Sequence, residues 1–161
     1  MKQPVLSGDE RFRLEKIAAD SITLTVGTSG ETIADLLSAH DGNIFDLTEA
    51  AATPGIDLII DFIDVIVFDR VRALANYDGS ANHSVAIAVW NWITSAWDIK
   101  DSMSGVEKSL VEHGFFIYDD ANYIGKGVNF GRVRVNLLHA LMGNVSHHTF
   151  IDEVALYKFV K

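Results

Sequence analysis

The chain has 161 residues, of which 48% are hydrophobic and 22% are charged, and its formal net charge is -9 at pH 7. This length is typical of one domain, so we predict a single domain over residues 1–161. The apolar fraction excludes a disordered chain, and the lack of cysteine excludes a disulfide scaffold, a Cys-type zinc site and a thiol enzyme. The first eight residues lack the apolar core of a secretory signal, which predicts a cytoplasmic protein.

The N-terminal third contains two predicted helix starts and one possible strand. Ser7 and Thr28 each precede a glutamate by three residues, which is the capping-box pattern of a helix N-terminus. Between them, residues 21–26 alternate with a period of two and include β-branched side chains. This pattern predicts a short strand or an extended link.

Long apolar runs in the rest of the chain predict core helices. Residues 56–76 exceed the length of a typical strand and carry four aspartates, which favours a core helix over a membrane span. Residues 79–97 contain no charge but many polar side chains, so they predict a buried helix, with a strand over 85–89 as the alternative. Shorter helices are predicted over 104–113, 128–142 and 150–160. The predicted fold class is therefore mainly α, a compact bundle-like domain with one or two short strands and no membrane segment.

A short motif near the C-terminus is a candidate for catalytic chemistry. Arg134, Asn136, Leu137 and His139 form the pattern Arg-x-Asn-Leu-x-His, which resembles a subgroup motif of the HEPN superfamily. The resemblance implies an all-helical, usually dimeric domain that is often a metal-independent endoribonuclease of defence, toxin–antitoxin or RNA-processing systems. A homodimer that cleaves single-stranded RNA is thus expected. The sequence departs from the subgroup at Ala140, where glycine is usual.

The residue types of this segment suit RNA cleavage without a metal. Transesterification needs a base, an acid and positive charge on the phosphorane. His139 would serve as base or acid, Arg134 would stabilise the phosphorane, and Asn136 is grouped with them as catalytic. Arg132 and Lys126 would bind the substrate. On a helix, the side chains of Arg134 and His139 would point in directions about 140° apart, whereas those of Arg132 and His139 would point in nearly the same direction. The motif therefore favours Arg134 as the partner of His139, and the helix geometry favours Arg132.

The acidic residues predict an alternative function. Ten acidic residues and no lysine or arginine lie between Lys16 and Arg70. Such a field attracts basic partners, which suggests a non-catalytic protein that binds and inhibits a basic, nucleic-acid-binding protein. Asp57, Asp61 and Asp64 would form one stripe on a helix and dock this partner. The same stripe could hold Mg²⁺ or be a solvated face, and the solvated face is favoured.

Two further patterns are interpreted as structural. The glycine-rich residues 124–133 do not have the spacing of a kinase phosphate loop, which predicts an ordinary loop. His147 and His148 lie near Asp152 and could suggest a metal, but adjacent histidines favour the polar first turn of a helix. We therefore expect no metal and no cofactor.

Overall fold

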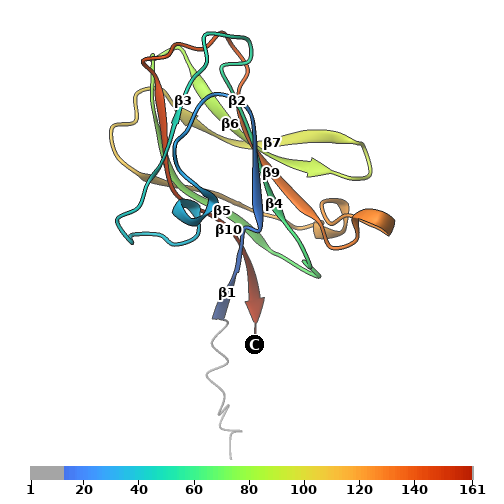
Figure 1. Ribbon diagram of the computed structural model, residues 1–161. Helices are drawn as coiled ribbons and strands as arrows, with labels where there is room; N and C mark the ends of the chain where they lie inside the picture. Colours follow the sequence, from blue (N-terminus) through green and yellow to red (C-terminus); the bar gives the residue numbers. More distant parts are fainter. Residues whose placement is uncertain (1–12, 161) are drawn as a thin grey trace, which may run out of the picture.

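The computed structural model describes residues 13–160. Within this range the chain forms ten β-strands and three 3-10 helices, and the longest of these helices is the four-residue η1 (Ile33–Leu36). The other two are η2 (Asp120–Asn122) and η3 (Gly127–Asn129). The mainly α fold predicted from the sequence was wrong (Figure 1).

The strands make two antiparallel five-stranded sheets, which we call sheet A and sheet B. In sheet A, β10 is the long central strand, and it pairs with β5 on one edge and with both β1 and β3 on the other. Its strands are β1 (Arg13–Ala18), β3 (Phe45–Thr48), β5 (Arg70–Asp78), β8 (Val111–Phe116) and β10 (His148–Val160). Sheet B has the order β2-β4-β9-β6-β7. Its strands are β2 (Ser21–Val26), β4 (Ile56–Phe62), β6 (Ser84–Asn91), β7 (Ala96–Ser104) and β9 (Val133–His139).

The two sheets pack face to face around one apolar core, so the fold is a β-sandwich (Figure 1). Alternate residues of each strand supply this core, because successive side chains of a strand point to opposite faces. In β9, for example, Val133, Val135 and Leu137 are fully buried in it. The residues between them face away from the core, and they form the outer face of sheet B.

The predicted helix over 56–76 is two strands joined by a connection without glycine or proline. Strands β4 and β5 flank residues 63–69, which contain neither glycine nor proline. Asp64 adopts a φ of 57° there, a left-handed conformation that aspartate tolerates better than most residues. The predicted helix over 79–97 likewise divides into β6 and the start of β7, with Ser95 at φ 53° in the turn.

Other predictions have mixed outcomes. Residues 21–26 form strand β2 and residues 124–133 are mostly loop, so these two predictions are confirmed. The helices over 104–113, 128–142 and 150–160 are wrong, because these residues overlap strands of both sheets. Thr28 pairs with Thr48 in an isolated bridge instead of starting a helix, and Ser7 lies outside the described residues. Among residues 13–160, no helix has the length and apolar character needed to cross a membrane.

Candidate functional site

The outer face of sheet B carries a row of polar and aromatic side chains that crosses four strands. Asp61 of β4 lies opposite Arg134 of β9, and Trp90 of β6 lies opposite Trp97 of β7. The β6–β9 register continues from the pair Val89–Val135, which places Trp90 beside Arg134. With strands spaced by about 4.8 Å, this row is about 14 Å long.

All three tryptophans of the chain gather at one end of this face. The ring centroids of Trp90 and Trp97 are 5.2 Å apart with an interplanar angle of 72°. Those of Trp90 and Trp92 are 6.3 Å apart at 82°. Each indole is half-buried, so part of its surface faces solvent. Trp92 is held in place because its Nε1 donates a hydrogen bond of 3.1 Å to the carbonyl of Arg132.

Beside the tryptophans, one aspartate binds two arginines. The Asp61 side chain is only 3% exposed. It accepts hydrogen bonds from Arg132 Nε and Nη2, both at 2.8 Å, and from Arg134 Nε at 3.0 Å. The hydrogen bonds to Asp61 raise the pKa of Arg132 above its ordinary value, although burial opposes the shift. The guanidinium groups are thus fixed in position and their charge is partly compensated.

Polar residues continue the outer face along the strands. Asn136 Nδ2 donates to Asp57 Oδ1 at 2.7 Å and to the Leu58 carbonyl at 3.2 Å. Asn136 is 1% exposed, so its amide serves mainly to orient Asp57. Ile99 lies next to Trp97 on the same face of β7 and is 66% exposed, which leaves an apolar surface beside the polar one.

The loop between β8 and β9 borders the tryptophan end of this face. Trp92 N donates to the Asn122 carbonyl at 2.8 Å, which ties the loop to the turn after β6. The loop forms a pocket of about 190 Å³ lined by Lys126, Ile66 and the exposed ring of Phe130, among others. Lys126, predicted to bind substrate with Arg132, thus lies in this neighbouring pocket, and it makes no described contact with Asp61.

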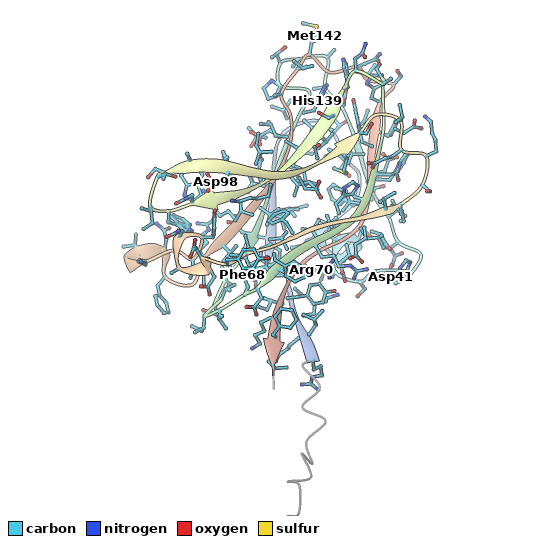
Figure 2. All side chains as sticks on the ribbon, turned by 180° about the vertical axis from the view of Figure 1, so that it is seen from behind. Asp41, Phe68, Arg70, Asp98, His139 and Met142 are labelled. Atoms are coloured by element: carbon cyan, nitrogen blue, oxygen red, sulfur yellow. The ribbon has the colours of Figure 1, made fainter. Side chains whose placement is uncertain are left out.

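His139 does not join Arg134 in a site. The two residues are five positions apart on one strand, and an odd spacing places them on opposite faces of the sheet. His139 is fully buried at the far end of β9, in the direction of Met142 (Figure 2), and its Nδ1 lies 2.9 Å from Glu49 Oε1. Burial and the neighbouring histidines lower the pKa of His139, while Glu49 opposes this shift. The catalytic pair therefore cannot form within one chain.

The three predicted partner-binding aspartates separate into two groups. Asp57 and Asp61 share the outer face of β4, because four positions is an even spacing on a strand. Both are engaged by Asn136 or by the arginines. Asp64 is exposed in the β4–β5 connection. The acidic stripe of a helix is thus absent from the described residues. The three tryptophans were assigned to a helix over 79–97, so their position on the outer face of a sheet was not predicted.

Solved structures of similar fold include carbohydrate-binding modules. A mutant of the module CBM29-2 in complex with cellulohexaose matches with a TM-score of 0.58 and 10% identity over 92% of this chain and 93% of that chain. The xylan-binding module CBM15 matches with a TM-score of 0.53 and 12% identity over 92% and 97%. No family model matches the chain, and no curated protein matches it.

The fold and the positions of the predicted site residues correct both functions predicted from the sequence. The helical ribonuclease was wrong, because its motif lies on a strand of a β-sandwich and its arginine and histidine face opposite sides. The acidic inhibitor was wrong as well, because the helix stripe on which it depended is not formed. The homodimer stays a prediction, which sedimentation velocity would test. At these identities the likeness establishes the fold, a β-sandwich of the kind found in carbohydrate-binding modules.

Proposed function

We propose that the chain binds a neutral glycan on the outer face of sheet B. The observation that carries this proposal is the cluster of three half-buried tryptophans, which continues directly into the row formed by Arg134 and Asp61. The names of the similar structures support it, since one contains cellulohexaose and another is described as xylan-binding.

The aromatic groups suit the apolar faces of sugar rings. An indole has a negative face, which attracts the slightly positive C–H groups of a pyranose. Trp90 and Trp97 lie on neighbouring strands, so one sugar chain can contact both. Because the rings are nearly perpendicular, they do not form one flat platform. This geometry favours a single, soluble glycan chain over the flat surface of a crystalline polysaccharide.

The polar groups of the row suit sugar hydroxyls, each of which is both a donor and an acceptor. Arg132 and Arg134 offer donors and the carboxylate of Asp57 offers an acceptor, while the nearly buried Asp61 holds the two arginines in place. Their mutual hydrogen bonds hold them in place before a ligand arrives, which reduces the entropy lost on binding.

The charges favour a neutral glycan over an anionic one. The net charge of -9 repels a polyanion at long range. Asp61 pairs with both arginines of the face, so neither is a free cation for a carboxylate or sulfate group.

The proposal is tested by titrating the full chain with cellohexaose, xylo-oligosaccharides and manno-oligosaccharides in a calorimeter. Tryptophan fluorescence provides a second readout, because all three tryptophans lie at the proposed site. We expect at least one neutral oligosaccharide to bind and shift the emission. Trp90→Ala and Trp97→Ala should each weaken this binding about tenfold or more, since covering a large apolar side chain contributes about 1.5–3 kcal/mol.

Phe116→Ala is the matched control, because this phenylalanine is 49% exposed and lies on β8 of sheet A, where it stacks on Phe159. Its affinity should equal that of the wild type. Failure of the folded wild type to bind any of the three neutral oligosaccharides contradicts the proposal, as does an equal loss of affinity in Phe116→Ala.

A further inference from the structure

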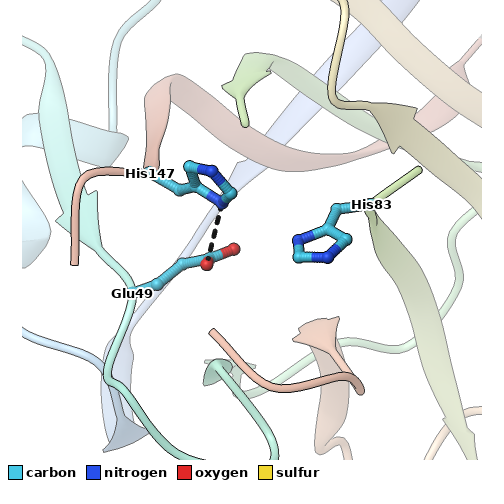
Figure 3. Close-up of side chains that lie close together, drawn as sticks. All are labelled: Glu49, His83 and His147. Atoms are coloured by element: carbon cyan, nitrogen blue, oxygen red, sulfur yellow. Dashed lines mark ion pairs between the residues drawn. The ribbon is translucent and has the colours of Figure 1, made fainter. Parts of the chain in front are cut away.

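A group of histidines lies with one glutamate at the opposite end of sheet B from the tryptophans. Glu49, His83 and His147 each offer a ligand atom, and these atoms all lie within 4.8 Å of one another (Figure 3). Glu49 follows β3 directly, His83 precedes β6, and His147 precedes β10. Each side chain is thus one residue from a strand end, and together they join sheet A to sheet B.

The carboxylate of Glu49 is held in a fixed orientation. Tyr77 OH donates a hydrogen bond of 2.6 Å to Oε1, and the backbone N–H of Asn144 donates one of 2.6 Å to Oε2. Glu49 is 1% exposed, and Tyr77 is fully buried. Burial and the hydrogen bond to Glu49 raise the pKa of Tyr77 well above its usual range, so Tyr77 stays protonated as the donor.

His147 has the surroundings of a metal-ligating imidazole. Its Nδ1 lies 3.2 Å from Glu49 Oε2. Two ligand atoms of tetrahedral zinc, with bonds of about 2.0–2.1 Å, are separated by about 3.3 Å. The other ring nitrogen, Nε2, lies 3.2 Å from Ser80 Oγ. Ligating histidines commonly direct the second nitrogen to such a partner, which fixes the ring and the tautomer.

Two more imidazoles bring nitrogen atoms that have no hydrogen-bond partner among the described residues. His83 Nδ1 and His139 Nε2 are buried without a partner, whereas His139 Nδ1 lies 2.9 Å from Glu49 Oε1. His139 is 0% exposed, and its ring centroid lies 4.7 Å from that of His83. Buried polar atoms normally find partners, because leaving one unpaired costs about 1–3 kcal/mol. A bound cation would give such a nitrogen lone pair a partner.

We propose that Glu49, His83 and His147 bind a divalent transition metal of the zinc type, beside the buried imidazole of His139. Imidazole nitrogen favours zinc and its neighbours in the first transition row over Ca²⁺ and Mg²⁺, which prefer oxygen ligands. The metal would join the segments before β6 and β10 to the end of β3. It would thereby stabilise this end of the sandwich without contacting the tryptophans.

The proposal is tested on tag-free full chain stripped with a chelator and then titrated with Zn²⁺ and Co²⁺. We expect one equivalent of Zn²⁺ per chain, a higher thermal midpoint with Zn²⁺, and the intense visible absorption of tetrahedral Co²⁺. His83→Gln and His147→Gln should lose more than about 100-fold in affinity. Tyr77→Phe, which removes the group orienting Glu49, should lose about 10- to 100-fold.

His148→Gln is the matched control, since His148 is adjacent in sequence but contacts Asp46 instead of Glu49. It should bind Zn²⁺ like the wild type. Wild-type protein that binds no stoichiometric Zn²⁺ overturns the proposal, as does unchanged affinity in both His83→Gln and His147→Gln. If these variants do not fold, the Co²⁺ spectrum of the wild type tests the proposal instead. A spectrum without the absorption bands of tetrahedral Co²⁺ overturns it. Trp97→Ala should retain full metal binding, which separates this proposal from glycan binding.

Discussion

The inner and outer faces of sheet B are made by the same strands but have different chemistry. On β9, the inward Val135 and Leu137 are fully buried in the core, whereas the outward Arg134 is half-buried and pairs with Asp61. On β6, the inward Val85 and Ile87 belong to the core, whereas the outward Trp90 contacts two other indoles. Alternate residues of one strand therefore face the core and the outer surface, and each set can be altered separately.

The largest effect is expected from shortening an inward side chain. Leu137→Ala leaves a cavity between the sheets, because Leu137 is 0% exposed, and should lower the free energy of unfolding by about 2–5 kcal/mol. Leu138→Ala alters the neighbouring, half-buried residue on the outer face and should have a much smaller effect. Urea denaturation of both variants measures the difference. Equal losses of unfolding free energy in the two variants would contradict the prediction that the inward face contributes more to stability.

A smaller effect is expected from removing the charge that binds the two outer arginines. Asp61→Asn keeps the shape but weakens the hydrogen bonds to Arg132 and Arg134, and should lower the free energy of unfolding by about 1.5–3 kcal/mol. It also releases positive charge on the outer face. Binding of alginate oligosaccharides should therefore rise relative to cellohexaose, as measured by affinity electrophoresis. Asp57→Asn is the control, because it leaves the ion pairs between Asp61 and the two arginines intact. An equal rise in alginate binding in this variant argues against the role of Asp61.

The outer face of sheet A extends the comparison, because it carries ion pairs where sheet B carries tryptophans. Glu153 is 2% exposed and accepts hydrogen bonds from Lys16 at 2.6 Å and from Tyr157 and Arg72 at 3.0 Å. Burial opposes ionisation of Glu153, but these partners outweigh it and lower the pKa of this carboxyl below its ordinary value of 4.5.

The lowered pKa makes stability depend on pH in a defined window. An ionised Glu153 stabilises the fold above its unfolded-state pKa of 4.5, and this contribution is lost as the pH falls through the lower folded-state pKa. Between about pH 5 and pH 3, the wild type should therefore lose more unfolding free energy than Glu153→Gln. Thermal unfolding followed by circular dichroism over this range measures the effect. Parallel pH profiles for the two proteins would contradict it.

Part of the fold was visible in the sequence as alternation with a period of two. Residues 21–26 alternate over their whole length and form β2 as predicted. The inward Val133, Val135 and Leu137 alternate in the same way, but Leu138 is also apolar, so the segment equally fits a helical face. Residues 56–76 appeared to be one long element because their turn is built on Asp64 at positive φ, without glycine or proline.

The candidate sites were predicted only in part. Arg134, Asn136, Asp57 and Asp61 were all selected from the sequence, and the structure places all four on one face. The family motif, and not the helix geometry, linked Arg134 to His139, since the two side chains would lie about 140° apart on a helix. On a strand the same spacing separates them. His147 was considered as a metal ligand beside Asp152, but the structure places it against Glu49.

The sequence alone determined the properties that depend on composition and local spacing. These are the net charge of -9, the lack of cysteine, the strand over residues 21–26, and the common face of Asp57 and Asp61, whose spacing of four is also even. Only the tertiary structure decided which distant residues meet. Asp61 and Arg134 are 73 positions apart, and Tyr77 and His147 are 70 apart. Such contacts depend on strand order and register, which buried packing fixes across the whole sandwich and no local pattern encodes.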